Sequence, residues 1–260
     1  GAQASLAVTK RNFDWRDWPE RFGDVFGGRA FSGGGQTFQL ELAPGSEVSS
    51  YRVAYTQPWL FDKPITFGWD AFIRQFTRFD YDVDRRGIDF SLGRRWILPG
   101  KQEDAVLAVG GLTRLESIDV DRVRRSSAST SFLAEGDNSL LSQRVSVSLD
   151  TRDHPLRPSS GWYAQASSEI GVGGDVRFWR NEIEVARHIR LWTDDEERHH
   201  VLSVRARVGH VKELGSSVRA DPNLFGQGFV PIYERYFAGG GTDGNGAMAV
   251  RGFEYGGAGP

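Results

Sequence analysis

The sequence predicts an all-β protein, an antiparallel transmembrane β-barrel with about ten strands in residues 1–260. Three observations carry this prediction. Apolar and polar residues alternate with period two along most of the chain. Several alternating segments exceed the five or six residues usual in globular sheets and fit the roughly 9–11 residues of a membrane-crossing strand. No run of 18 apolar residues occurs, which excludes a transmembrane helix.

The alternation places ten strands in order along the chain. In the segment 144–149, for example, Val145, Val147 and Leu149 alternate with polar residues. The predicted strands lie near residues 4–12, 36–43, 48–57, 65–77, 84–96, 104–118, 140–152, 161–171, 175–192 and 199–214. Short turns separate most of them, so the sheet is expected to be antiparallel.

One short helix is predicted between the first two strands. Asp17 is its expected cap and Pro19 occupies a first-turn position that tolerates proline. Its apolar face would be formed by Trp18, Phe22, Val25 and Phe26, and Gly27-Gly28 would end it.

Ionisable residues occupy the face opposite the apolar one. They are Arg52, Asp70, Arg74, Asp89, Arg144, Asp150, Glu169, Glu182, Glu184, Arg205 and Arg207. In a soluble β-sandwich this face would be the solvated exterior, whereas in a membrane barrel it would line the water-filled lumen. Strand length, the aromatic content of 12% and the preference for arginine favour the barrel. Four of the 32 basic residues are lysine, and the planar fork of arginine suits paired charges on a wall.

The composition excludes several functions. The net charge is -2, so nothing favours nucleic acid as a partner. The absence of cysteine excludes disulfides, thiolate metal sites and a cysteine nucleophile. The five histidines are isolated or adjacent on a strand, which is poor spacing for metal ligands. A formal G-x-G-x-x-G at Gly239, Gly241 and Gly244 has no helix after it. We expect no enzyme activity, cofactor, metal or small-molecule substrate.

Two segments resemble a known family. The first, Asp150-Thr-Arg-Asp-His-Pro-Leu-Arg-Pro-Ser-Ser-Gly161, contains Asp150, Arg152, Asp153, Pro155 and Gly161. The second is Tyr233-Glu-Arg-Tyr-Phe-Ala-Gly-Gly240, which contains Phe237, Gly239 and Gly240, followed by Val250, Arg251, Gly252 and Phe253. Together they resemble the outer-membrane protein assembly factor superfamily and its branch of BamA-type β-barrel insertases. The first segment resembles the family's turn between its eighth and ninth strands, and the second its long sixth extracellular loop.

The resemblance implies a domain organisation and a function. Residues 1–260 would form a partial outer-membrane barrel, with strands resembling the family's second to eleventh of sixteen and the start of the sixth loop. The periplasmic POTRA repeats are not in this sequence. The implied function is the insertion and folding of other β-barrel proteins, by lateral gating and strand templating. The implied location is the outer membrane of a diderm bacterium rather than an organelle. The implied partners are the lipid bilayer, unfolded client proteins and periplasmic accessory lipoproteins.

The physics of the loop motif leads to a site hypothesis. Arg251 lies between glycine-rich segments that allow a sharply folded loop. An arginine held inside a barrel needs carboxylate partners, because an unpaired buried charge is costly. We therefore expect Arg251 to hold the loop against the inner wall, with Phe253 packed beside it.

Four other functions stay open from the sequence. Two belong to the same superfamily: a two-partner secretion pore and a translocation-and-assembly subunit. A plain porin would have a wide open lumen and no loop inside it. A soluble β-sandwich binding module would stay dissolved without detergent.

Overall fold

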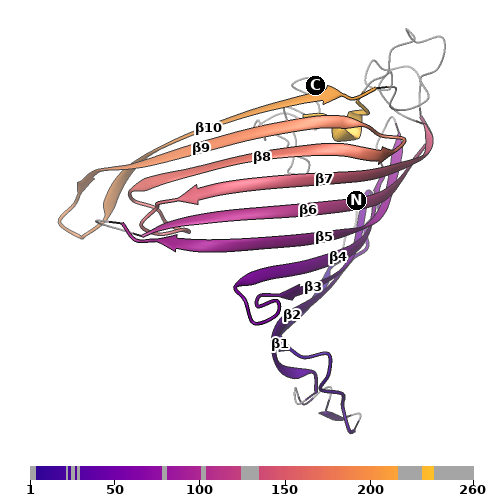
Figure 1. The fold of residues 1–260 in the computed structure, drawn as a ribbon, viewed down its shortest axis with the longest axis horizontal. Helices are drawn as coiled ribbons and strands as arrows, with labels where there is room; N and C mark the ends of the chain where they lie inside the picture. Colours follow the sequence, from indigo (N-terminus) through magenta and orange to yellow (C-terminus); the bar gives the residue numbers. More distant parts are fainter. Residues whose placement is uncertain are drawn as a thin grey trace.

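The computed structural model describes residues 4–21, 23–24, 27, 30–77, 81–100, 104–123, 135–215 and 230–236. In this part of the chain ten strands form one sheet, and each strand pairs antiparallel with its neighbours in sequence (Figure 1). The strands are β1 (Leu6–Phe13), β2 (Ser32–Ala43), β3 (Val48–Gln57), β4 (Ile65–Thr77), β5 (Asp82–Leu98), β6 (Ala105–Asp121), β7 (Gly136–Asp150), β8 (Gly161–Gly174), β9 (Phe178–Thr193) and β10 (His199–Glu213). The predicted antiparallel all-β fold is confirmed.

The two faces of the sheet differ as the period-two pattern predicts. Apolar side chains on one face are exposed, among them Val145 at 62%, Ile183 at 58% and Val208 at 70%. The opposite face carries ion pairs between neighbouring strands, such as Arg52 with Asp70 and Arg207 with Glu182. A long antiparallel sheet with an apolar outer face and a charged inner face is the arrangement of a transmembrane barrel wall.

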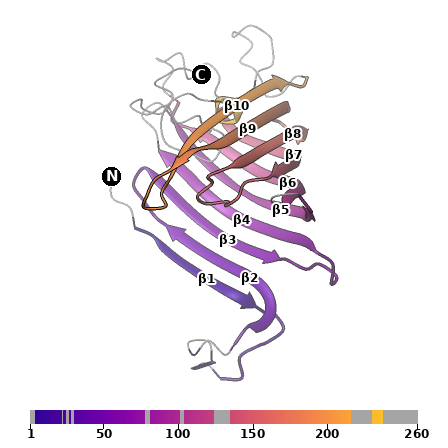
Figure 2. The same cartoon turned by 90° about the vertical axis from the view of Figure 1, so that its left-hand side faces the viewer.

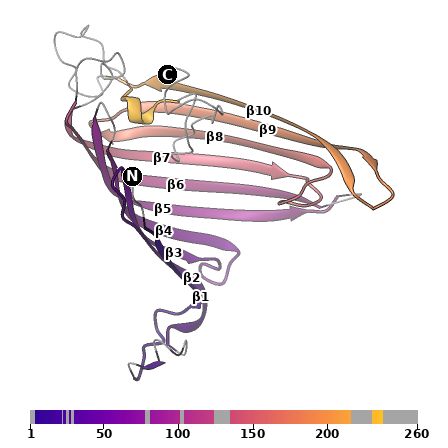
Figure 3. The same ribbon diagram turned by 180° about the vertical axis from the view of Figure 1, so that it is seen from behind.

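The sheet is curved, and its charged face is concave. Arg85 on β5 and Arg180 on β9 both contact the same residue, Glu234. In a flat sheet, four strand spacings would separate the backbones of these arginines by about 19 Å, which is too far for both side chains to reach one carboxylate. The sheet forms an open trough, with β1 and β10 at its two edges (Figures 2 and 3). Among the described residues β1 and β10 do not pair, so the barrel is incomplete.

A buried apolar cluster lies at one end of the concave face. It is formed by Tyr81, Val83, Ile118, Val120, Leu140, Val176, Phe178, Val230 and Tyr233. Val230 and Tyr233 belong to the segment around the short 3-10 helix η2 (Ile232–Glu234), which is far from the other members in sequence. We call this the loop end of the sheet, since β10 ends there, and the opposite end the turn end.

The predicted helix between the first two strands is wrong at its start. Trp18 to Arg21 are not helical. Asp17 instead organises the start of β2: its carboxylate accepts the backbone N–H of Ser32 at 2.9 Å, and its carbonyl accepts that of Phe31 at 2.7 Å. A helical hydrogen bond appears later, from Gly27 N–H to the carbonyl of Gly23 at 2.9 Å. Phe22, Val25, Phe26 and Gly28 lie outside the described residues. Within the described chain, no helix is both long and apolar enough to cross a bilayer.

Candidate functional site

The candidate site is a short segment, Val230–Tyr236, which lies on the concave face and which we call the loop root. Pro231 directly precedes η2, and the backbone N–H of Glu234 donates to the Pro231 carbonyl at 2.9 Å. Arg235 Nε donates to the Val230 carbonyl at 2.7 Å and closes the turn. Tyr233 is 6% exposed and packs in the apolar cluster.

Glu234 is fully buried and meets arginines from three strands. Its Oε1 accepts from Arg85 Nη2 at 2.9 Å and from Arg114 Nη2 at 3.3 Å. Its Oε2 accepts from Arg180 Nη2 at 2.5 Å, and the same nitrogen also donates to the Glu234 backbone carbonyl at 2.6 Å. One carboxylate of the loop root therefore connects β5, β6 and β9.

Two carboxylates of the wall complete this ionic network. Glu116 on β6 binds Arg85 at 2.5 Å and Arg114 at 2.7 Å. Glu169 on β8 binds Arg114 at 2.6 Å and Arg144 at 2.5 Å, and it accepts a hydrogen bond from the Ser142 hydroxyl at 2.7 Å. We call this set the arginine network: Arg85, Arg114, Arg144, Arg180, Glu116, Glu169 and Glu234. It has four cations and three anions, so Glu234 supplies a third of its negative charge.

The network keeps Glu234 ionised although it is buried. Burial by itself raises the pKa of a carboxyl group. The charges of Arg114, Arg180 and Arg85 outweigh this effect and hold the pKa of Glu234 well below its ordinary value. The side chain therefore remains an anion between these guanidinium groups.

Tyr236 provides a second attachment of the loop root. Its ring lies against Gly209 of β10, where an added Cβ would come within 2.5 Å of the ring. Its hydroxyl donates to the backbone carbonyl of Asn181 on β9 at 3.2 Å. Only a residue without a side chain allows the ring to approach the strand this closely.

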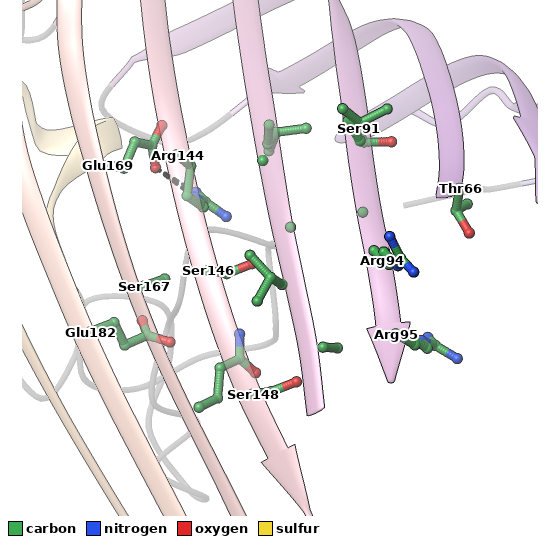
Figure 4. A pocket seen from close by; sticks show the side chains of 18 of the residues that line it. Thr66, Ser91, Arg94, Arg95, Arg144, Ser146, Ser148, Ser167, Glu169 and Glu182 are labelled. Atoms are coloured by element: carbon green, nitrogen blue, oxygen red, sulfur yellow. Dashed lines mark hydrogen bonds and ion pairs between the residues drawn. The ribbon is translucent and has the colours of Figure 1, made fainter. Parts of the chain in front are cut away.

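A cavity of about 820 Å³, lined by both polar and apolar residues, extends from the loop root along the concave wall. Tyr236 and Arg180 line it beside the network, and small residues from neighbouring strands, including Gly110, Ser146 and Ser167, line the wall. Figure 4 shows Arg144 and Glu169 joined on this wall, with the serines and Glu182 beyond them. No group of three or more His, Asp or Glu residues suited to a metal ion occurs among the described residues.

The turn predicted from the first motif lies between β7 and β8. Arg152 binds Asp150 through both oxygens, at 2.8 and 2.7 Å, and its Nη1 donates to the Pro155 carbonyl at 3.2 Å. Asp153 accepts backbone N–H groups of Ser159 at 2.8 Å and Ser160 at 3.2 Å. Arg190 of β9 also reaches Asp153, at 3.4 Å.

Gly161 lets this turn close onto β8. It has a φ of +104°, and an added Cβ would lie 2.3 Å from the Thr151 carbonyl oxygen. The two carboxylates of the turn, Asp150 and Asp153, thus both have partners: Arg152 binds Asp150, and the N–H groups of Ser159 and Ser160 donate to Asp153.

The other predicted site residues lie outside the described part of the chain. They are Phe237, Gly239, Gly240, Val250, Arg251, Gly252 and Phe253. The sequence prediction missed most of the arginine network: Arg85, Arg114, Glu116, Arg180 and Glu234 were not singled out, whereas Arg144 and Glu169 were. The missed arginines and Glu116 fall in predicted strands, and Glu234 falls in the Tyr233–Gly240 stretch, but alternation does not show which charges meet across a curved wall.

Comparison with known proteins agrees with this geometry. A family model described as the Omp85 superfamily domain matches residues 31–260. The outer membrane protein assembly factor BamA of Nitratidesulfovibrio vulgaris is 29% identical over 216 residues, which cover 82% of this chain and 24% of the relative. The chain thus spans about a quarter of that protein's length. The crystal structure of BamA from Haemophilus ducreyi lacking POTRA domains 1–3 superposes with a TM-score of 0.64 at 15% identity, covering 98% of this chain and 43% of that one.

Proposed function

Because this chain belongs to the Omp85 superfamily, we propose that it forms part of a barrel that inserts and folds β-barrel proteins in the outer membrane of a diderm bacterium. The name of the N. vulgaris relative, an outer membrane protein assembly factor, supports this function. The structural observation that carries it is the loop root held inside a lipid-exposed barrel wall. In this proposal β1 to β10 correspond to the family's second to eleventh strands.

The proposed mechanism involves no covalent chemistry. Client strands would add to an exposed strand edge of the completed barrel, because unpaired backbone N–H and C=O groups template a new strand. Local thinning of the bilayer would lower the barrier to insertion. The unfolded client, the lipids and periplasmic accessory lipoproteins are the proposed partners.

The wall facing the lumen suits a loop rather than an open pore. We propose that Arg251 holds the loop against the inner wall with Phe253 beside it. Replacing Arg251 by alanine is then expected to increase protease cleavage within residues 237–260 and to reduce assembly of client proteins. Arg198→Ala, in the exposed turn between β9 and β10, is the matched control. Unchanged cleavage and unchanged assembly in Arg251→Ala would rule out this role.

The function is tested by depleting the full-length gene product and fractionating the cells. An insertase predicts that the protein is found in the outer membrane and that unrelated barrel proteins disappear with it. Loss of a single secreted partner would replace this function by two-partner secretion. Unchanged levels of all barrel proteins would leave a porin-like role, and a soluble product would refute the membrane assignment.

A further inference from the structure

We infer that Glu234 is a positioning residue that fixes the loop root to the barrel wall, so that Val230–Tyr236 keeps its place on the wall. Only the client-assembly measurement in the test of this inference rests on the proposed function. It concerns the described segment Val230–Tyr236 and its contacts with β5, β6, β9 and β10.

The first argument is the origin of the contacts. The arginines that bind Glu234 precede it by 149, 120 and 54 residues in the sequence. They are fixed on strands whose backbones each pair over their full length with one neighbouring strand. The Glu234 carboxylate therefore binds arginines that the strands of the wall already hold in place.

The second argument is charge. With Glu234 the arginine network has four guanidinium and three carboxylate groups, and without it four and two. Arg85, Arg114 and Arg180 have side chains 7–8% exposed, so water does not replace the lost partner. Uncompensated buried charges strongly oppose such a change. Movement of Glu234 away from the wall is thus disfavoured by the wall itself.

The third argument is packing on both sides of Glu234. Tyr233 inserts into the apolar cluster at the loop end, and Tyr236 rests on Gly209 with its hydroxyl bound to Asn181. Three successive attachments, apolar, ionic and aromatic, fall within four residues. The segment between Tyr233 and Tyr236 therefore cannot bend without breaking one of them.

Hydrogen–deuterium exchange of the full-length protein in lipid nanodiscs tests this inference, because it reads the loop root without requiring activity. In the wild type, backbone amides of 230–236 should be protected both at rest and with an unfolded client barrel protein added. In Glu234→Gln their exchange should be roughly a hundredfold or more faster. Glu234→Asp, which keeps the charge, should recover part of the protection. Glu184→Gln, which removes a wall carboxylate paired with Arg205 outside the network, should leave it unchanged.

A second variant keeps the inference testable if Glu234→Gln folds poorly. Glu234→Gln with Arg180→Met removes one anion and one cation, so the network keeps its excess of one positive charge. The double variant should assemble in the membrane and still exchange rapidly at 230–236. It should also assemble clients more slowly than the wild type.

Two results would overturn the inference. One is a protected loop root in Glu234→Gln or in the double variant. The other is a wild-type loop root that loses protection when the client binds. A protein whose loop root behaves as expected but which assembles no client would instead refute the proposed function and leave the positioning role in place.

Discussion

The ring of Tyr236 lies against Gly209 on β10 and fills the space that the Cβ of any other residue at this position would occupy. Gly209→Ala is expected to displace the ring, because the added Cβ would lie 2.5 Å from it. Overpacking of this kind costs about 1–3 kcal/mol. The displacement is measured as the solvent accessibility of Tyr236 or as hydrogen exchange of the backbone amides of residues 230–236. Gly93→Ala is the control and should have little effect. Gly93 lies on β5 and faces the concave side, as Gly209 does on β10, but an added Cβ there would have its nearest neighbour at 3.4 Å. Equal effects of the two substitutions would show that the ring is not held by Gly209.

Arg114 is the most connected arginine of the network, since it meets all three carboxylates, Glu116, Glu169 and Glu234. Arg114→Met leaves three buried carboxylates short of a partner, and a loss of about 3–5 kcal/mol is expected. The urea concentration at which the barrel unfolds, followed by tryptophan fluorescence, measures the loss.

The control for Arg114 is Arg198→Met in the β9–β10 turn. Arg198 also pairs with carboxylates, Asp194 and Glu196, but its side chain is 69% exposed, so its loss should cost about 0–1 kcal/mol. Similar unfolding midpoints for the two variants would contradict a special role for the network.

Alternation was enough to predict ten strands, because the side-chain period of a strand is two and each strand of the wall has one apolar face. It misplaced the start of β2, which begins at Ser32 rather than near residue 36. Gly33 and Gly35 have positive φ there, and Phe13 pairs with both Ser32 and Gln36, so no alternating side chains mark these residues. The arginine network escaped prediction for another reason: Arg85 and Arg180 reach the same carboxylate, Glu234, only because the sheet curves, and curvature leaves no trace in a period-two pattern.

Gly161 is expected to tolerate no side chain. Its φ of +104° is unfavourable for other residues, and a Cβ would lie 2.3 Å from the backbone oxygen of Thr151. Gly161→Ala should therefore destabilise the β7–β8 turn by about 1–3 kcal/mol or more. The readout is the fraction of protein that assembles into a heat-modifiable barrel on gels. Gly173→Ala, whose nearest neighbour is a flexible leucine side chain at 3.4 Å, should assemble normally. Normal assembly of Gly161→Ala would mean that the turn relaxes around the new methyl group.

Asp153 makes the same turn sensitive to acid. Burial raises the pKa of its carboxyl, but the hydroxyl of Ser159 and the backbone N–H groups of Ser159, Ser160 and His154 lower it more, so it lies well below the ordinary value. A depressed folded-state pKa stabilises the protein above the unfolded pKa, near 4, and this stabilisation disappears as the pH falls toward the folded-state value.

Urea unfolding between pH 7 and pH 3 tests this linkage. Asp153→Asn removes the charged acceptor, and at pH 7 it should cost about 1–3 kcal/mol. The difference between wild type and variant should be constant above about pH 5 and shrink below about pH 4, because Asp153 in the unfolded wild type then binds a proton while the folded state keeps it ionised. Asp195→Asn, at an exposed position in the β9–β10 turn, controls for the loss of one negative charge and should give no such difference. A wild-type advantage that persists unchanged at pH 3 would show that the Asp153 contacts do not depend on its charge.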